Sequence, residues 1–268
     1  MIGTRRLVPY LKVWMRLTSL QFESQVANAR GAAVGFILGK LFRFLFAFVM
    51  VYVIVGRAKA LAGYNLQEAI LILAFFNLIQ TLNQLFFRGV YMFRQKVQDG
   101  SFDFYLLNPL SELFYSLFSY TDALDVLMIL PYTVILGWAW VATGYPVTLA
   151  TILLILLVIA ISMLFVFALH VVVVSIGVRY LEVDNTIMLY RDVEKMAAFP
   201  INMYGKFGSI FLTYIIPFGL MATVPANIVF GLVNPWVLGV FAVLVIVQVK
   251  LALLYWRRSL LTYSSASS

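Results

Sequence analysis

The longest apolar stretch of the chain sets the strongest limit on its fold. From residue 147 to residue 178 the sequence contains no Asp, Glu, Lys or Arg. Because about 20 apolar residues suffice for an α-helix to cross the hydrocarbon core of a bilayer, a helix of this length must tilt within a membrane or project from it. Over the whole chain 63% of the residues are hydrophobic and 11% are charged, whereas soluble domains carry about 25% charged residues. The sequence therefore predicts an all-α integral membrane protein.

The net charge of +8 arises from 19 Lys and Arg residues against 11 Asp and Glu residues. Basic residues gather on the cytoplasmic loops of membrane proteins, so this excess needs no nucleic-acid partner. The lack of cysteine excludes disulfides and Cys-ligated metals, and the single histidine, His170, has no carboxylate at helical spacing with which to bind a metal. We therefore expect no metal, no cofactor and no nucleic-acid partner for this chain.

Apolar segments separated by polar turns predict one transmembrane domain with six spans. The expected spans are 35–55, 68–87, 115–140, 147–178, 183–200 and 236–256. Before them, residues 5–30 place Leu and aromatic residues, such as Leu11 and Trp14, among Lys and Arg at helical spacing. A helix with this pattern lies in the membrane interface, so we expect 5–30 to be an interfacial helix.

The fifth span can be placed in two ways. In the first arrangement, 183–200 crosses the membrane and 205–224, which contains Pro217, is a broken re-entrant segment on the outer side. In the second, 180–199 is a cytoplasmic interfacial helix and 205–224 is the span. The first candidate span carries Arg191, Asp192, Glu194 and Lys195 within it. Because a charge at the centre of a spanning helix costs roughly 3 kcal/mol on insertion scales, the charge argument favours the second arrangement.

The distribution of basic residues predicts the orientation in the membrane. With the N-terminus inside the cell, twelve basic residues near the span ends are cytoplasmic, and two or three, among them Arg57 and Lys59, lie outside. Cytoplasmic loops carry the excess of Lys and Arg, so both termini are expected in the cytoplasm. The chain is then a multi-pass protein of the cell membrane with an even number of spans.

Two pairs of charged residues lie within expected spans. Asp122 and Asp125 are three residues apart and so share one face of the third span, and Lys40 and Arg43 share one face of the first at a similar depth. A charge inside the membrane needs an opposite charge or a watery cavity. We hypothesise that the two pairs meet and neutralise each other. The alternatives are a role in gating or substrate contact, and basic side chains that reach the interface without any contact.

The most polar internal segment, 88–112, carries the second informative pattern. Asp99 and Gly100 break one helix there, and Ser101 or Asp103 can cap another. The aromatic residues of this cytoplasmic segment are Phe102, Phe104 and Tyr105. Exposed apolar groups bordered by charges usually mark a protein contact, although aromatic side chains also rest at the membrane interface.

Three segments carry a resemblance to a known family. They are QDGSFDFYLLNPLSELF at 98–114, FPINMYGKFGSIFLTYIIPFGLMATVPANIVFG at 199–231 and the closing YWRRSLLTYSSASS at 255–268. Together with the order of the predicted elements, they resemble the membrane subunits of type-2 ABC transporters, the exporter permeases, over nearly the whole chain. One departure is Gly205, which stands where a Pro or a bulky residue is more usual in the family.

The resemblance implies several structural assignments. It favours the first arrangement, with 183–200 as the fifth span and 205–224 as outer re-entrant helices that contain or adjoin Pro200, Pro217 and Pro225, and so it conflicts with the charge argument. It makes 5–30 an elbow helix and 94–106 a cytoplasmic coupling helix. The expected contacts of this coupling helix with an ATPase are Gln98, Asp99, Gly100, Phe102 and Asp103.

The resemblance also implies partners and a function. Two permeases, identical or related, would pair with a cytoplasmic dimer of ABC ATPases, which bind the ATP and Mg, so this chain would form the translocation pathway without being an enzyme. Its abundance of Phe, Tyr and Met favours an amphipathic or hydrophobic substrate. Two alternatives from other classes would use Asp122 and Asp125. One is a proton-driven secondary transporter, which would work without any ATPase, and the other is a lipid-acting membrane enzyme.

Overall fold

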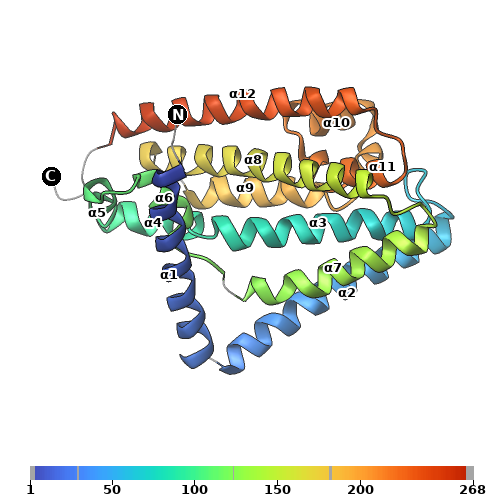
Figure 1. Ribbon diagram of the computed structural model, residues 1–268, viewed down its shortest axis with the longest axis horizontal. Coiled ribbons are helices and arrows are strands. Elements are labelled where there is room, and N and C mark those ends of the chain that lie inside the picture. Colours follow the sequence, from blue (N-terminus) through green and yellow to red (C-terminus); the bar gives the residue numbers. More distant parts are fainter. Residues whose placement is uncertain (1–3, 29, 123, 181–182, 264–268) are drawn as a thin grey trace.

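The computed structural model describes residues 4–28, 30–122, 124–180 and 183–263, all of whose regular elements are helical (Figure 1). Residue 29 of the expected interfacial helix, residue 123 of the expected third span and residues 264–268 of the closing segment lie outside this description. The long helices are α1 (Thr4–Asn28), α2 (Arg30–Ala58), α3 (Leu66–Phe87), α7 (Asp125–Thr143), α8 (Leu149–Tyr180) and α12 (Pro235–Leu260). The short ones are α4 (Val90–Gln98), α5 (Phe102–Leu107), α6 (Glu112–Phe118), α9 (Val183–Met196), α10 (Gly205–Ile210) and α11 (Thr223–Val229).

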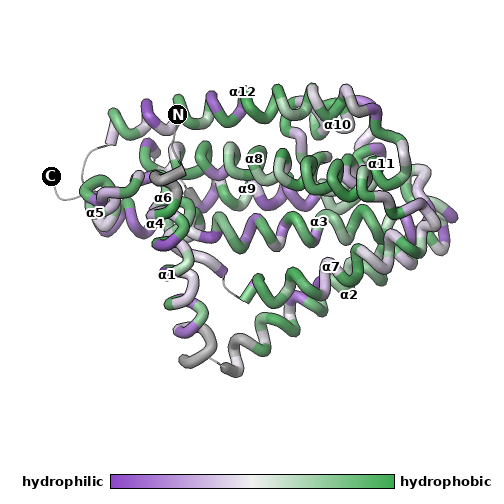
Figure 2. The backbone as a smooth tube through the Cα atoms, in the orientation of Figure 1, coloured by the Kyte–Doolittle hydropathy of each residue, from purple (hydrophilic) through white to green (hydrophobic). Residues whose placement is uncertain are grey.

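Five helical stretches of the described residues are long and apolar enough to cross a membrane. They are Val34–Ala58, Leu66–Gln98, Asp125–Thr143, Leu149–Tyr180 and Trp236–Leu260. Their outward faces carry exposed Leu, Val and Phe side chains, and Figure 2 shows hydrophobic residues along the length of these helices. Because only a bilayer solvates such apolar faces, the chain is an all-helical, multi-pass membrane protein, as its composition predicts.

The helix α3 forms the centre of the bundle. It packs along α7 and also contacts α2, α8 and α11, while α8 packs along α12. Side chains on every side of α3 are therefore buried, including Leu71, Ile72, Phe75 and Ile79. The helix begins in a capping box with Asn65, whose side chain accepts a hydrogen bond from the backbone N–H of Glu68 at 3.0 Å.

The expected third span, 115–140, is broken in the structure. α6 ends at Phe118 and α7 begins at Asp125, so Asp122 lies in the irregular stretch between the helices. Asp122 and Asp125 therefore do not share a face of one helix, which corrects the prediction from their spacing. The Gln21 side chain of α1 compensates the break, because its Nε2 donates to the Ser119 carbonyl at 2.9 Å and its Oε1 accepts from the Thr121 N–H at 2.7 Å. Irregular backbone inside a membrane protein persists where protein groups satisfy its hydrogen bonds.

Removing the two hydrogen bonds of the Gln21 side chain is expected to destabilise the irregular stretch between α6 and α7. The variant Gln21→Ala leaves two backbone groups unpaired and should lower the free energy of unfolding by about 1–3 kcal/mol. Hydrogen exchange of the Thr121 amide should speed up accordingly. Ser19→Ala is the matched control on α1, because the Ser19 hydroxyl contacts the exposed Glu23 side chain and lies away from the break. Unchanged exchange at Thr121 would show that Gln21 does not hold this stretch.

Neither arrangement predicted for the fifth span corresponds to one regular helix. α9 ends at Met196 after 14 residues, before Pro200. The chain then forms the 3-10 helix η1 (Ile201–Tyr204), α10, the π-helix η2 (Phe211–Ile215), the 3-10 helix η3 (Phe218–Met221) and α11. In Figure 1, α8 ends near α4 and α5, whereas α12 begins at the opposite end of the bundle. The residues from 183 to 234 therefore cross the length of the bundle in short pieces.

Candidate functional site

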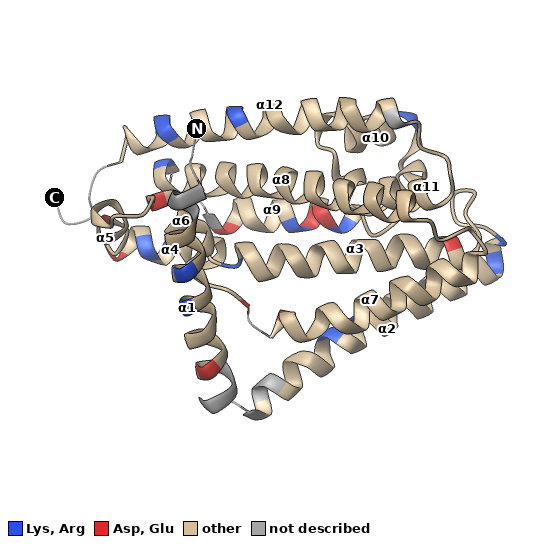
Figure 3. Cartoon of the chain, in the orientation of Figure 1, with Lys and Arg blue, Asp and Glu red and all other residues tan. Residues whose placement is uncertain are grey.

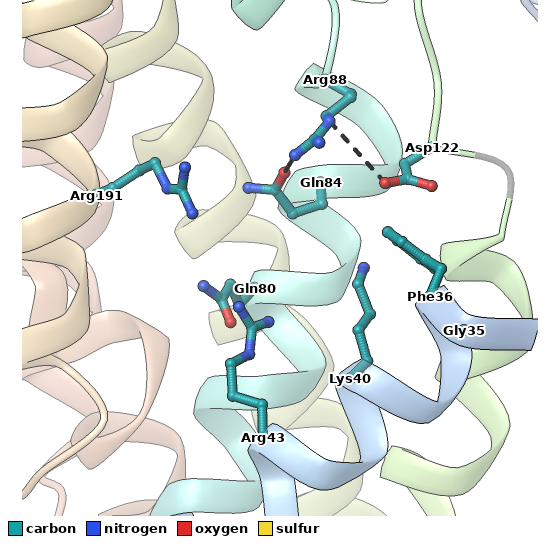
Figure 4. A pocket seen from close by; sticks show the side chains of 10 residues that line it. Gly35, Phe36, Lys40, Arg43, Gln80, Gln84, Arg88, Asp122 and Arg191 are labelled. Atoms are coloured by element: carbon teal, nitrogen blue, oxygen red, sulfur yellow. Dashed lines mark hydrogen bonds and ion pairs between the residues drawn. The ribbon is translucent and has the colours of Figure 1, made fainter. Parts of the chain in front are cut away.

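A polar cavity of about 350 Å³ lies between α2, α3 and α9 (Figure 4). α2 contributes Lys40 and Arg43, and α3 contributes Gln80 and Gln84. The remaining charged side chains that line it are Arg88, Asp122 and Arg191. Four cations and one carboxylate thus face a single space between helices of a largely apolar bundle. Figure 3 shows charged residues in the middle of α9 and on α2, separate from the charged residues at the end of the bundle formed by α4 and α5.

Two cations of this cavity are paired with carboxylates. Lys40 Nζ forms an ion pair with Asp125, whose side chain is fully buried, and it also lies 4.4 Å from the centre of the Phe36 ring. Arg88 Nε lies 3.9 Å from Asp122 Oδ2, and its Nη1 donates to Gln84 Oε1 at 2.7 Å. The structure thus brings Lys40 to Asp125, whereas the partner of Asp122 is Arg88, which is not a member of either predicted pair.

The other two cations, Arg43 and Arg191, have no carboxylate within ion-pairing distance in the part of the chain that the structure describes. Arg43 therefore does not join the predicted charge cluster. The guanidinium of Arg191 lies 5.7 Å from the centre of the Tyr91 ring. Sequence reasoning treated Arg191 as one charge among several in a candidate span, and its place in the cavity follows from the packing of α9 against α4 and α8.

A second cavity of about 170 Å³ adjoins the first and shares Arg43, Gln80 and Arg191 with it. Glu194 of α9 lies at its wall and is almost fully buried. Its Oε1 accepts hydrogen bonds from Asn83 Nδ2 at 2.8 Å and from the Tyr190 hydroxyl at 3.1 Å. Both bonds satisfy the carboxylate, and the bond from Asn83 joins α9 to α3.

The predicted coupling segment is a helix–turn–helix at one end of the bundle. α4 ends at Gln98, Gly100 adopts a left-handed φ of +75°, and α5 begins at Phe102. A residue with a side chain rarely adopts this conformation, so the turn requires glycine. The Ser101 backbone N–H donates to Asp99 Oδ1 at 2.9 Å, and hydrogen bonds from Ser101 hold the pKa of Asp99 below its usual value.

Phe102 is fully buried rather than exposed, which corrects its assignment as a contact residue. Its ring packs 5.3 Å from Phe93, 6.3 Å from Trp256 and 5.1 Å from Tyr263, measured between ring centres. The hydroxyl of Tyr263 donates to Asp103 Oδ1 at 2.9 Å, and burial together with this carboxylate raises the pKa of Tyr263 to about 12. Phe102 and Asp103 therefore fasten α5 to α4 and to the end of α12.

The surface of the turn is formed by other residues. Gln98 and Asp99 are exposed, as predicted contacts would be, while Phe104 is 69% and Leu107 81% exposed. The sequence does not reveal that Phe102 is buried and Phe104 is exposed. Their burial depends on which ring faces the residues at the end of α12, and that contact leaves no pattern in the sequence of α5. We call the exposed residues Gln98, Asp99, Phe104 and Leu107 the tip.

Comparison with known proteins adds one finding to this geometry. The model of the family described as "ABC-2 family transporter protein" matches residues 41–267, which include the helix–turn–helix and all of α3 to α12. The match begins just after Lys40, so it includes the cavity residues from Arg43 onward. No curated protein and no solved structure matches the chain. Membership of this family implies a membrane transport subunit that associates with an ABC ATPase. The match covers most of the chain, and the protein therefore belongs to the ABC-2 type transporter permease family.

Proposed function

We propose that this chain is the permease subunit of an ATP-driven exporter of the cell membrane. It would pair with a second permease, identical or related, and with a cytoplasmic dimer of ABC ATPases that binds ATP and Mg. The observation that carries the proposal is the tip, which presents two large apolar side chains beside the polar Gln98 and the charged Asp99 at one end of an apolar bundle. Such a surface is suited to docking in a cleft of a soluble partner.

The attachment of the tip supports a mechanical role. α4 continues the direction of α3, and α5 is fixed to α12 through Phe102, Trp256 and the Tyr263–Asp103 hydrogen bond. A displacement of the tip would therefore move α3 and α12 together. ATP can drive the permease between inward-open and outward-open states only if the ATPases contact the tip differently in the two states.

The distribution of charge supports a cytoplasmic position for the tip. Arg94, Lys96 and Arg179 lie at the same end of the bundle as α5, and so do Arg257 and Arg258 at the end of α12 (Figure 3). Because cytoplasmic regions carry the excess of Lys and Arg, this end faces the cytoplasm and both termini lie there.

The opposite end of the bundle would then hold the re-entrant segment. Pro200 and Pro217 precede η1 and η3, and Pro225 lies in α11. The irregular backbone around η3 is buried in protein, and the Ser162 hydroxyl donates there to the Leu220 carbonyl at 2.6 Å. With α9 and this segment as the fifth crossing, the chain has six crossings and an outer gate for an amphipathic or hydrophobic substrate.

The two alternative functions would need Asp122 or Asp125 as a free base. Asp125 is paired with Lys40 and Asp122 lies beside Arg88, so the proton-driven and lipid-acting alternatives gain no support.

The tip provides the decisive test. The test uses the complex with the co-purifying ABC ATPase. The double variant Phe104→Ala/Leu107→Ala is expected to reduce substrate-stimulated ATP hydrolysis or ATPase affinity about tenfold or more, because a few large side chains buried at the centre of an interface carry most of its binding energy. Phe207→Ala is the matched control, since Phe207 is 84% exposed and lies in α10 near the other end of the bundle. Unchanged coupling, or labelling of residue 104 from outside the cell, would refute the proposed function.

A further inference from the structure

We infer that the polar cavity between α2, α3 and α9 binds the phosphate of an anionic amphiphile, with Arg43 and Arg191 as its principal contacts. The inference goes beyond the proposed function, because binding to the isolated permease needs no ATPase. Its basis is an excess of positive charge that the described residues leave unmatched.

The charge balance of the cavity is the first step. Lys40 is paired with Asp125, and Arg88 lies beside Asp122, so these cations are matched within the protein. Arg43 and Arg191 face the same space from α2 and α9, and no described carboxylate lies within ion-pairing distance of either. Figure 4 shows both guanidinium groups reaching into this space.

The nearest candidate to neutralise them from within is Glu194, which lines the adjoining cavity together with both arginines. Its described hydrogen bonds go to Asn83 of α3 and to Tyr190, one turn earlier on α9. It attracts both arginines across the adjoining cavity but forms no ion pair with either. Lys195, the other charged residue of that cavity, is paired with Asp192 at 2.7 Å. Two guanidinium groups within a membrane bundle thus retain free hydrogen-bond donors, an arrangement that is unfavourable unless water or an anion solvates them.

The chemistry of the donors selects the ligand. Arginine forms paired hydrogen bonds with phosphate oxygens, and two guanidinium groups on opposite walls can bind different oxygens of one phosphate. The amide groups of Gln80 and Gln84 lie on the third wall, where they can donate to the same group. A volume of about 350 Å³ lies at the lower end of small-molecule sites, so it accommodates a head group rather than a whole lipid.

The surroundings indicate where an apolar chain would lie. On α2, Phe42 stands between Lys40 and Arg43 in the sequence and Phe46 follows about one turn after Arg43, and both rings are exposed on the outside of the bundle. An amphiphile with its phosphate in the cavity could place its acyl chains along this apolar surface, in contact with the bilayer. The same cavity can also accept free phosphate, and the two sources are distinguished by experiment.

The test measures ligand binding to the purified full chain in detergent, without the ATPase. The probes are short-chain phosphatidic acid, the diacylglycerol with the same acyl chains, and inorganic phosphate. We expect phosphatidic acid to bind, diacylglycerol not to bind, and the variant Arg43→Met/Arg191→Met to lose at least about tenfold in affinity. Equally tight, arginine-dependent binding of inorganic phosphate would identify the free ion as the ligand of the same site.

The control variant is Arg57→Met, which removes an exposed arginine from the other end of α2 and should leave binding unchanged. If the double methionine variant fails to fold, Arg43→Lys/Arg191→Lys keeps the charges and should weaken binding severalfold, because lysine cannot form the paired contact. The inference would be overturned by any of three results. The arginine double variant could bind phosphatidic acid as tightly as the unchanged protein, diacylglycerol could bind as tightly as phosphatidic acid, or Arg57→Met could lose as much affinity as the double variant. A protein that does not bind phosphatidic acid could still couple to the ATPase through the tip. Likewise, loss of the coupling role of the tip would not affect phosphate binding in the cavity.

Discussion

Replacing Asp125 by alanine is expected to lower the free energy of unfolding by about 3–5 kcal/mol, the cost of leaving one partner of a buried ion pair without the other. The Asp125 carboxylate is fully buried and Lys40 is mostly buried against it, with the Phe36 ring on the ammonium group. Removal of the carboxylate leaves the ammonium in a cavity that contains three arginines and one other carboxylate, Asp122, which already lies beside Arg88. Repulsion from these arginines adds to the cost of desolvation, so Asp125→Ala should be among the most damaging single changes in the bundle.

The comparison that isolates the pair uses a second substitution. Lys40→Met/Asp125→Leu replaces both charges by apolar groups and should recover much of the stability lost in either single variant, because no uncompensated charge remains. Reversible unfolding by detergent titration measures all of these variants. Arg43→Met serves as the control, since Arg43 lies three residues from Lys40 without a described ion pair and should change stability little. A double variant no more stable than Asp125→Ala would show that the ion pair does not hold α2 to α7.

This pair also shows how far the sequence could predict the site. Depth in the membrane and spacing along the chain were sufficient to suggest that Lys40 and Asp125 meet, because a charge inside a span needs a partner. They were insufficient for Asp122, whose position depends on a break in the third span. That break is stabilised by Gln21, about 100 residues earlier in the chain, and its hydrogen bonds to Ser119 and Thr121 leave no periodic signal in the sequence around it.

The fold was likewise predictable in some segments and not in others. Hydropathy predicted the long apolar helices α2, α3, α8 and α12 because each must satisfy the bilayer over its own length. It did not predict how residues 183–234 would be divided, since η3 and α11 are held by contacts with α3 and α8, which leave no local apolar periodicity in the sequence. The charged face of α9 looked costly in lipid, but Glu194 is bonded to Asn83 and Tyr190, and Arg191 faces a polar cavity.

The second large effect is expected at Phe102. Its ring fills the space between α4, α12 and the residues that follow α12, and truncation of a buried phenylalanine costs about 3–5 kcal/mol. Phe102→Ala should therefore detach α5 from the bundle, exposing residues 99–107 to limited proteolysis while the spans stay folded. Because the α5 anchor is lost, coupling to the ATPase should fall as well, although Phe102 itself has no exposed surface.

Phe104→Ala separates anchoring from docking. The two phenylalanines stand on the same short helix, yet Phe104 is 69% exposed, so its truncation should leave protease resistance and stability unchanged while it weakens coupling to the ATPase. Phe102→Ala should alter both properties together. If Phe104→Ala also released the segment to proteolysis, Phe104 would be a packing residue and the tip would lose its main contact. If Phe102→Ala left the segment protected, the Tyr263–Asp103 hydrogen bond and the remaining aromatic contacts would suffice to hold α5, and force from the ATPases would reach α12 without Phe102.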